Sequence, residues 1–394
     1  MINTGKGYIS VYALFGIWSV SALTSLPGLA VSPISEDLAR IFPAATELEI
    51  QMLTTLPSLL IIPFILLAGY ISDRMGYIRL LYIGLSLFLL SGILYFVCGN
   101  IGQLLVVSAM LGVGAGIIVP LSTALVSKFF VGEERTRQYG YVSAITNIAL
   151  VVATAVTGWL ADIQWRLPFL VYLLPLVSIL LVPAMNRNAK RLNNSAEEHV
   201  SLQSGGTVCY KRLCKYMFYY LFITYLVMVV SINLPFLLGH YGYDSAVSGT
   251  VTSLFFLAMM LPGLFINRIL ALLGRNVLYW ALFLIALGLL DVFLNSSMIF
   301  VVIGCIAAGF GYGMAQPYIY DRASLLASPG RVTYVMALVM VMNYVAIVVS
   351  PFVVEAVQWL FDMTGDRSPF LLNAIAAALA LAALLLRKSV VSKH

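Results

Sequence analysis

Long apolar runs alternate with short polar segments along the whole chain. A helix needs about 20 apolar residues to cross a bilayer. Runs near that length occupy twelve stretches: residues 9–33, 50–72, 78–98, 103–127, 139–161, 167–185, 216–238, 246–267, 276–296, 298–324, 332–358 and 369–388. Gly, Pro and charged residues bound these runs, as is typical of turns between helices. The pattern predicts an all-α integral membrane protein with twelve transmembrane helices.

The composition agrees with a membrane protein and excludes a soluble globule. Of the 394 residues, 61% are hydrophobic and only 10% are charged, whereas soluble domains carry about 25% charged residues. The spans leave too few residues for a separate catalytic or nucleic-acid-binding domain. The first apolar run is longer than the roughly 7–15 residues of a signal-peptide core, so we expect it to be retained as a span.

The distribution of the basic residues predicts the orientation of the chain. With the N-terminus in the cytoplasm, all of the 22 Lys and Arg residues except Arg40, Arg166 and Arg367 fall on the cytoplasmic side, as the positive-inside rule requires. The net charge of +6 thus reflects topology. Because these residues are spread over every inner loop, they form no continuous patch for nucleic acid, and no nucleic-acid partner is expected.

The chain divides into two similar halves. A polar stretch, residues 186–215, is predicted to be a cytoplasmic linker between an N-terminal six-helix bundle (1–185) and a C-terminal six-helix bundle (216–394). The pattern G-x-G-x-G-x-x-x-P begins at Gly112 and again 197 residues later at Gly309. These glycines lie inside apolar runs and follow no strand, so a nucleotide-binding loop is not expected. The repetition predicts two parallel six-helix repeats, an architecture found in secondary transporters.

The chemistry of a metalloprotein or an enzyme is not expected. Four cysteines and three histidines are scattered over the chain. Cys209 and Cys214 form the only close pair, and this spacing without nearby histidines is a poor zinc signal. Because no nucleophile–base cluster stands out, we expect no bound metal, no cofactor and no enzymatic activity.

One loop motif points to a protein family. The segment between the second and third spans reads Gly69-Tyr-Ile-Ser-Asp73-Arg74-Met-Gly76-Tyr-Ile-Arg79. It resembles the loop signature of the major facilitator superfamily, in which a Gly, an Asp-Arg pair, a second Gly and a basic residue follow the second of twelve spans. The cluster that ends at Arg135 and the Trp-Arg pair at 165–166 also look like superfamily features. The resemblance covers the whole chain.

The resemblance implies that this loop locks the cytoplasmic side while the outside is open, with Asp73 and Arg74 as gating residues. An acidic side chain at the membrane edge needs a cationic or helix N-terminal partner, which Lys128 or Arg135 could supply to Asp73. The predicted gating set is Gly69, Asp73, Arg74, Gly76, Arg79, Lys128 and Arg135.

The resemblance also implies a central substrate cavity lined by spans one, four, seven and ten and flanked by two, five, eight and eleven. The predicted cavity residues are mostly aromatic or amide side chains: Tyr12, Trp18, Asn147, Tyr225, Asn233, Gln316, Tyr320, Asn343 and Tyr344. Such a lining suits neutral or cationic amphipathic solutes, which stack on rings and need few hydrogen bonds. Asn147 and Asn343 occupy matched positions in the repeats and are expected to face the cavity.

Proton coupling would need a carboxylate that alternating access exposes. Spans one and four contain no charged residue, so Asp321 in the tenth span is the predicted proton carrier, with Arg322 as its neighbour. An equally good interpretation places both at the membrane interface with their charged ends in water. Coupling through Glu36 or Asp37, or no proton coupling at all, are further alternatives.

These features predict a major facilitator-type secondary transporter that moves a small organic solute by alternating access. The leading hypothesis is proton-coupled efflux of neutral or cationic amphipathic compounds by a monomer in the cytoplasmic membrane of a bacterium, with both termini in the cytoplasm. The alternatives are uptake of a sugar or small organic acid, and a sensor or scaffold without transport. Many drug/proton antiporters of the superfamily carry an arginine at the position that Ser108 occupies here.

Overall fold

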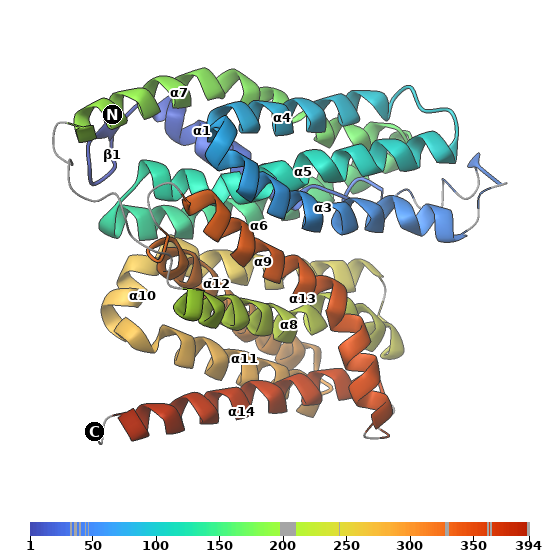
Figure 1. The fold of residues 1–394 in the computed structure, drawn as a ribbon. Helices are drawn as coiled ribbons and strands as arrows, with labels where there is room; N and C mark the ends of the chain where they lie inside the picture. The colour runs from blue at the N-terminus through green and yellow to red at the C-terminus, as the bar shows by residue number, and fades with distance from the viewer. Residues whose placement is uncertain are drawn as a thin grey trace. The chain divides into compact units, whose positions relative to one another are not determined.

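The chain is almost entirely helical (Figure 1). A computed structural model describes residues 1–31, 34, 38, 41–43, 45, 47–197, 210–243, 245–327, 331–360, 362 and 365–391. Within this part of the chain, eleven helices are long and apolar enough to cross a membrane. The all-α membrane fold expected from the hydrophobic pattern is confirmed.

The first half begins with a short hairpin and continues with long helices. Its elements are β1 (Ile2–Asn3), β2 (Tyr8–Ile9), α1 (Val11–Ala22), the 3-10 helix η1 (Leu23–Ser25), α3 (Glu47–Met75), α4 (Tyr77–Leu94), α5 (Ile101–Phe129), α6 (Gly132–Ile163), the 3-10 helix η3 (Leu167–Leu173) and α7 (Pro175–Glu197). Side-chain caps explain two of the helix starts. Ser10 accepts from the Ala13 N–H before α1, and Asn100 accepts from the Gln103 N–H before α5.

The second half repeats this sequence of long helices. Its elements are α8 (Tyr210–His240), α9 (Ser245–Leu264), α10 (Ile266–Leu273), the 3-10 helix η4 (Gly274–Asn276), α11 (Val277–Leu294), α12 (Met298–Ser324), α13 (Val332–Leu360) and α14 (Ser368–Val391). The short helix α10 is not anticipated by the hydrophobic pattern, which predicts one span over 246–267. Pro262 lies near the break and favours a local bend.

The first span is shorter than its hydrophobic pattern predicts. The pattern extends over residues 9–33, but the helix ends at Ser25. Pro27 has no backbone N–H with which to continue the helical hydrogen bonds, and Gly28 adopts a φ of +80°, which glycine takes readily. The apolar helix Val11–Ser25 is therefore shorter than the eleven long spans.

The predicted linker is partly helical. Helix α7 continues to Glu197, and α8 already begins at Tyr210. Residues 198–209, with Cys209 among them, lie outside the described residues. The division of the chain into bundles at 186–215 stays a prediction.

Glycines place α5 between α3 and α4. A Cβ on Gly112 would lie 2.7 Å from the Pro57 backbone of α3, and a Cβ on Gly114 would lie 2.8 Å from the Phe88 nitrogen of α4. Small residues at these positions let the helix backbones approach closely. The first copy of the glycine motif therefore packs α5 against both neighbours.

The second copy does the same for α12. A Cβ on Gly309 would lie 2.6 Å from the Phe255 oxygen of α9, and a Cβ on Gly311 would lie 2.7 Å from the Ala281 oxygen of α11. Helices α9, α11 and α12 thus correspond to α3, α4 and α5. The two parallel repeats predicted from the motif are confirmed.

The chain forms two compact units. One contains Met1–Gln138, Ile145–Leu213 and Tyr320–Tyr344, and the other contains Tyr139–Ala144, Cys214–Ile319 and Val345–His394. Each unit consists mainly of one sequence half and includes a piece of the other half. Contacts between the two sequence halves are thus found inside single units.

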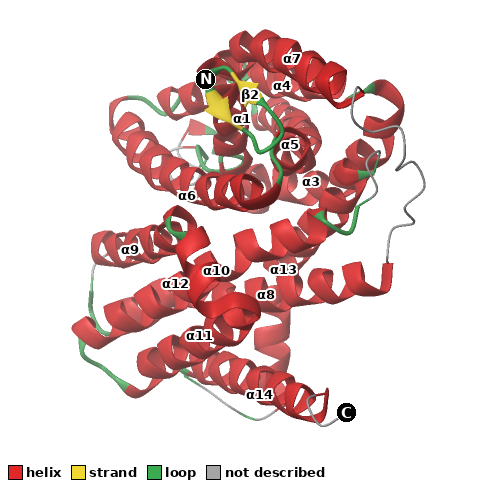
Figure 2. Cartoon of the chain, turned by 90° about the vertical axis from the view of Figure 1, so that its left-hand side faces the viewer, coloured by secondary structure: helices red, strands yellow, loops and turns green. Residues whose placement is uncertain are grey.

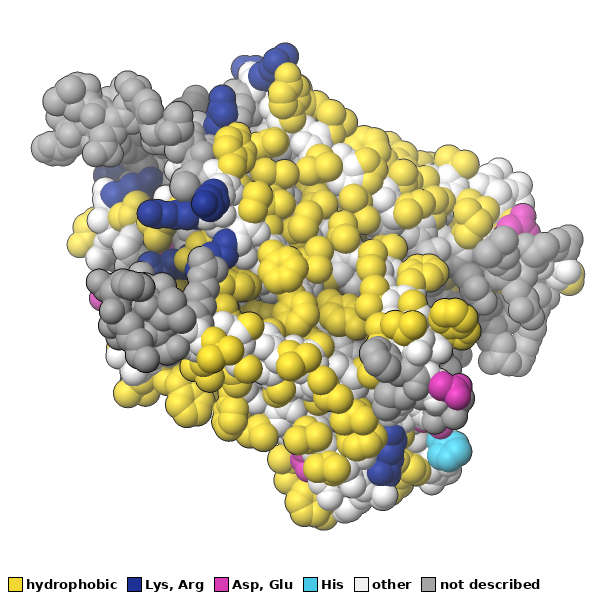
Figure 3. Space-filling model, turned by 60° about the horizontal axis from the view of Figure 1, so that its bottom comes forward, with side chains coloured by type: hydrophobic (Ala, Val, Ile, Leu, Met, Phe, Trp, Pro, Cys, Tyr) yellow, Lys and Arg dark blue, Asp and Glu magenta, His cyan; other side chains and the backbone are white. Residues whose placement is uncertain are grey.

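The exterior is apolar, as a bilayer requires. Large exposed side chains include Trp159, Leu180 and Phe352. Hydrophobic side chains cover most of the face drawn in Figure 3, whereas Lys and Arg side chains gather mostly toward one edge. In the described part of the chain, the only strands form the hairpin beside the N-terminus (Figure 2).

Candidate functional site

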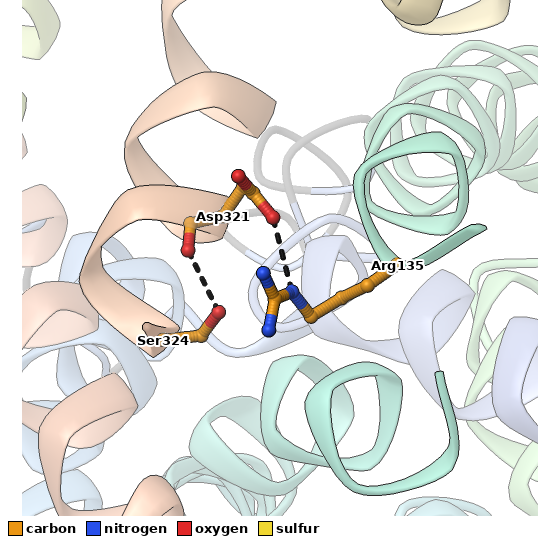
Figure 4. A network of polar contacts seen from close by, with 3 residues as sticks. All are labelled: Arg135, Asp321 and Ser324. Carbon is orange, nitrogen blue, oxygen red and sulfur yellow. Dashed lines mark hydrogen bonds and ion pairs between the residues drawn. The ribbon is translucent and has the colours of Figure 1, made fainter. Parts of the chain in front are cut away.

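Asp321 forms a buried ion pair with Arg135. Arg135 Nε donates to Asp321 Oδ1 over 3.0 Å, and the side chains of Arg135 and Asp321 are 11% and 9% exposed, respectively. Ser324 donates its hydroxyl to the Asp321 carbonyl oxygen at 2.8 Å (Figure 4). Both charges have left water, so each depends on the other for compensation. The pair joins α6 to α12, two helices from different sequence halves, within one compact unit.

Local sequence places each partner. Helix α6 begins at Gly132, where φ is +59°, and Arg135 follows in its first turn. Helix α12 continues past Pro317 to Ser324, which puts Asp321 in its last turn. Successive helical residues point about 100° apart, and the partner of Asp321 comes from α6 rather than from its sequence neighbour Arg322.

The predicted gating loop joins α3 to α4. Gly76 precedes α4 at a φ of +82°, a conformation that favours glycine. The Arg74 guanidinium donates to the Tyr70 hydroxyl at 2.6 Å and lies over the same ring, while Arg79 is exposed. The Asp73 side chain lies outside the described residues, so its role and its partner stay predictions.

The two cations predicted to partner Asp73 occupy different surroundings. Lys128 lies at the end of α5, with its Nζ 4.1 Å from the ring centroid of Tyr77, which is a cation–π arrangement. Arg135 pairs with Asp321. The structure therefore gives Arg135 a carboxylate partner that the loop motif alone does not indicate.

Two close helix crossings also join the sequence halves. At Gly69 of α3, an added Cβ would lie 2.6 Å from the Ala337 Cβ of α13. At Gly140 of α6, an added Cβ would clash with the Gly263 backbone oxygen of α9, and a Cβ on Gly263 would clash with Gly140. Gly140 and Ala337 are separated by the repeat offset of 197 residues. The crossings are therefore equivalent in the two repeats, and each lies within one compact unit.

A chain of hydrogen bonds passes through Gln316. The Ser143 hydroxyl donates to Gln316 Oε1 at 2.6 Å, and Gln316 Nε2 donates to the Tyr220 hydroxyl at 3.2 Å. These residues come from α6, α12 and α8 and belong to one compact unit. Amide and hydroxyl groups gathered in this way can bind hydrogen-bonding groups of a solute. The predicted cavity residue Gln316 thus lies beside two polar residues outside the predicted set.

Two other predicted cavity residues bond to neighbouring elements. Trp18 Nε1 donates to Gln138 Oε1 at 3.0 Å, which ties α1 to α6. The Tyr344 hydroxyl of α13 donates to the Thr24 carbonyl oxygen at 3.5 Å. Both contacts lie within one compact unit. Each holds a residue that the sequence analysis predicts to line the cavity.

The remaining predicted cavity residues differ in burial. Tyr320 is buried and contacts the Met340 sulfur at 3.5 Å. Asn147 is also buried, whereas Tyr12 is 69% exposed at the start of α1. The half-buried members of the set are Tyr225, Asn233 and Asn343. Their place on a cavity wall stays a prediction, and Glu36 and Asp37 lie outside the described residues.

Ser108 forms a buried polar contact that packs α5 against its neighbours. Its hydroxyl lies 2.6 Å from the Tyr95 hydroxyl, and both side chains are fully buried. The Tyr95 ring stacks on Phe169 with centroids 4.3 Å apart. The position at which many antiporters of the resembled family carry arginine is therefore used here to hold α5 to neighbouring elements.

Replacing Ser108 with Ala is expected to lower the free energy of unfolding by about 1–3 kcal/mol, because it leaves the buried Tyr95 hydroxyl unpaired. The double variant Ser108→Ala/Tyr95→Phe removes both hydroxyls, so we expect it to recover much of that loss. Thermal unfolding of the purified variants in detergent measures both effects. Equal stability of the single variant and the wild type would contradict the assignment.

Sequence reasoning missed several residues in these contacts, namely Gln138, Gly140, Ser143 and Tyr220. One signal was available for Gly140, which lies one repeat offset before Ala337. No comparable local pattern marks the others, because their partners are far away along the chain.

Comparison with known proteins agrees with this architecture. A family profile described as Major Facilitator Superfamily matches residues 13–351 and 217–394. A crystal structure of a double-tryptophan mutant of XylE is similar with a TM-score of 0.82 and 14% identity, covering 95% of each chain. At this identity the likeness shows the fold.

Two curated bacterial proteins match shorter stretches of the sequence. The quinolone resistance protein NorA of Staphylococcus aureus is 29% identical over 114 residues, which is 29% of this chain and 29% of NorA. The multidrug transporter protein MdtP of Bacillus subtilis is 28% identical over 109 residues, which is 27% of this chain and 20% of MdtP. The matches span under a third of either relative.

The family profile covers nearly the whole chain, and the repeated helix packing agrees with it. The chain therefore belongs to the major facilitator superfamily of membrane transporters.

Proposed function

We propose that this transporter exports small neutral or cationic amphipathic solutes in exchange for protons, by alternating access. The observation that carries the proposal is the Arg135–Asp321 pair between α6 and α12. It joins the two sequence halves through side chains, and within the same compact unit α3 crosses α13 closely at Gly69. Such contacts can separate without unfolding either repeat, as a gate must do when rigid helices move.

The gate is assigned to the cytoplasmic face. Arg135 lies among the basic residues that the positive-inside rule places in the cytoplasm, and the predicted gating loop ends at the same face. We place the protein in a bacterial inner membrane as a monomer, with both termini in the cytoplasm. In this proposal, the pair is formed in the state that is closed toward the cytoplasm and broken in the state that is open to it.

Asp321 can link the gate to protons. Protonation would remove the negative charge that holds Arg135 and so weaken the pair. A proton taken up by Asp321 would favour separation of the two helices, and release of the proton would favour closure. In this scheme Asp321 acts as gate and proton carrier together.

The names of the similar proteins support efflux. NorA is a quinolone resistance protein and MdtP a multidrug transporter, and the predicted cavity set is rich in aromatic and amide side chains. Uptake of a hydroxylated solute is the second candidate. The hydrogen-bonded chain of Ser143, Gln316 and Tyr220 favours it, because amides and hydroxyls bind sugar-like groups.

Flux through purified protein in liposomes tests the proposal and separates the candidates. Ethidium and tetraphenylphosphonium serve as cationic amphipathic probes and xylose as a hydroxylated probe. An imposed pH gradient is expected to drive accumulation of a cationic probe, whereas protein-free liposomes show none. Xylose accumulation without cation flux would favour uptake. Movement of a probe that ignores the pH gradient would contradict proton coupling, and no flux of any probe would contradict the proposed substrate class.

A further inference from the structure

The N-terminal hairpin docks onto the turn between α5 and α6. Thr4 is fully buried at the hairpin turn, and its carbonyl oxygen accepts from the Val131 N–H at 2.9 Å. Gly5 has a φ of +81° and lies so close that a Cβ would be 2.8 Å from the Val131 oxygen. Lys6 follows directly and donates its Nζ to the Lys128 carbonyl oxygen at 2.6 Å. The hairpin therefore holds an ammonium group at the end of α5.

Lys6 forms one wall of a cavity of about 520 Å³, which we call the Lys6 cavity. Its lining residues are Lys6, Tyr77, Ser127, Lys128, Phe129, Val131, Arg135, Ala189, Ser324, Leu325, Ala327 and Val332. All of them belong to one compact unit. Ligand pockets in proteins typically measure about 300–1,000 Å³, so the Lys6 cavity has room for a small organic molecule.

The charge of the lining is positive. Among the described lining residues, Lys6, Lys128 and Arg135 are cationic and none carries a carboxylate. Asp321 lies just behind the lining and bonds to Nε of Arg135, which leaves the terminal guanidinium nitrogens of Arg135 without a described bond. Lys6 uses one of its three ammonium N–H groups in its described contacts. Several donors from different directions can therefore reach one bound anion.

Two helix starts at the cavity, those of α4 and α6, add to this potential, whereas the C-terminal ends of α5 and α12 carry the opposite partial charge. Tyr77 begins α4 and Val131 precedes α6, and neither helix start has a side-chain cap in the described contacts. Helix N-termini carry partial positive charge. Phe129, Val131 and Leu325 supply an apolar part of the wall. The arrangement suits an anion with several oxygen atoms attached to a small organic group.

We propose that the Lys6 cavity binds a phosphate ester, either the headgroup of an acidic phospholipid or a soluble phosphate monoester. Arginine and lysine bind phosphate oxygens through charge-assisted hydrogen bonds. The lining includes the hairpin, the end of α5, the start of α6, the end of α12 with Ala327, and the start of α13. A bound phosphate therefore holds residues of both sequence halves together and stabilises the state in which Arg135 pairs with Asp321. This site is distinct from the binding site of any transported solute. Its test therefore measures binding and does not require a transport assay.

The first test measures, by calorimetry, the binding of glycerol 3-phosphate to the purified full-length chain in detergent. Charge-assisted hydrogen bonds are among the strong ones, so Lys6→Gln is expected to weaken binding about tenfold. Lys211→Gln is the matched control, because Lys211 is exposed and lies outside the cavity lining. It is expected to bind like the wild type.

A second pair of variants tests charge separately from the fold of the hairpin. Ala327→Glu puts a carboxylate on the cavity wall and is expected to abolish binding, whereas Ala327→Gln adds similar bulk without charge and is expected to retain it. Nanodiscs of phosphatidylglycerol and of phosphatidylcholine distinguish the sources of phosphate. A lipid headgroup is identified by three results together. The melting temperature of the wild type is higher in phosphatidylglycerol than in phosphatidylcholine, this rise is lost in Lys6→Gln and Ala327→Glu, and glycerol 3-phosphate does not bind. The proposal is overturned if neither probe affects the wild type, or if Lys6→Gln and Ala327→Glu respond as the wild type does.

Discussion

Transport is expected to fall at least about tenfold when either member of the Arg135–Asp321 pair is replaced by alanine. Both side chains are almost fully buried, and removing one partner of a buried ion pair costs about 3–5 kcal/mol because the other charge stays uncompensated. The loss falls on the state in which the pair is formed. Since about 1.4 kcal/mol is a factor of ten, that state becomes more than about a hundredfold less populated and the transport cycle stalls.

The exposed ion pair of Glu134 and Arg137 provides the control. Its atoms lie 3.5 Å apart, with side chains 28% and 49% exposed, and exposed pairs contribute about 0–1 kcal/mol. Glu134→Ala is therefore expected to leave transport and melting temperature nearly unchanged. The double variant Arg135→Met/Asp321→Leu removes both buried charges, so we expect it to regain stability without normal transport. Normal flux in Arg135→Ala and Asp321→Ala would show that the pair is not a gate.

A leucine at Gly140 is expected to prevent closure at the α6–α9 crossing. A Cβ at this position would overlap the Gly263 backbone oxygen, and backbone cannot swing aside as a flexible side chain does. Overpacking typically costs about 1–3 kcal/mol even where side chains can adjust. We expect Gly140→Leu to populate the closed state at least about tenfold less and to reduce transport accordingly, as flux in liposomes would measure.

Gly158→Leu is the matched substitution, because Gly158 lies on the same helix and an added Cβ there would meet no atom within 4 Å. It is expected to fold and transport like the wild type. The prediction fails if Gly140→Leu transports as well as Gly158→Leu. If both variants lose expression, Gly140→Ala provides the smaller test, since even a single Cβ meets the Gly263 oxygen.

The helical spans could be predicted closely because a bilayer imposes one strong constraint. Helix α5 begins within two residues of the predicted span, and α12 matches it at both ends. The first span is different because Pro27 and Gly28 lie inside an apolar run, so backbone geometry ends the helix before hydrophobicity does. The sequence pattern did not predict the N-terminal hairpin, because each of its strands has only two residues and the hairpin depends on docking at Val131.

The candidate site was only partly predictable. Arg135 and Asp321 were both singled out, but they lie 186 residues apart, and no local pattern assigns one to the other. Sequence proximity favoured Arg322 as the neighbour of Asp321. The repeat relates Gly140 to Ala337 and could have indicated the equivalent crossings. The Ser143–Gln316–Tyr220 chain has no such signal, because ordinary polar residues become a cluster only when three helices meet.

The central claim is that the Arg135–Asp321 pair breaks and re-forms as the sequence halves move. Pulsed electron–electron double resonance tests this claim most directly, because it measures the distance between two spin labels. The four native cysteines are removed, and the labels are attached to cysteines that replace Met75 and Leu325. Both positions are exposed and lie in one compact unit, at the end of α3 and just after α12. We predict two distance populations in the wild type, with Asp321→Asn shifting the molecules toward the longer distance. A single distance that Asp321→Asn leaves unchanged would contradict the claim.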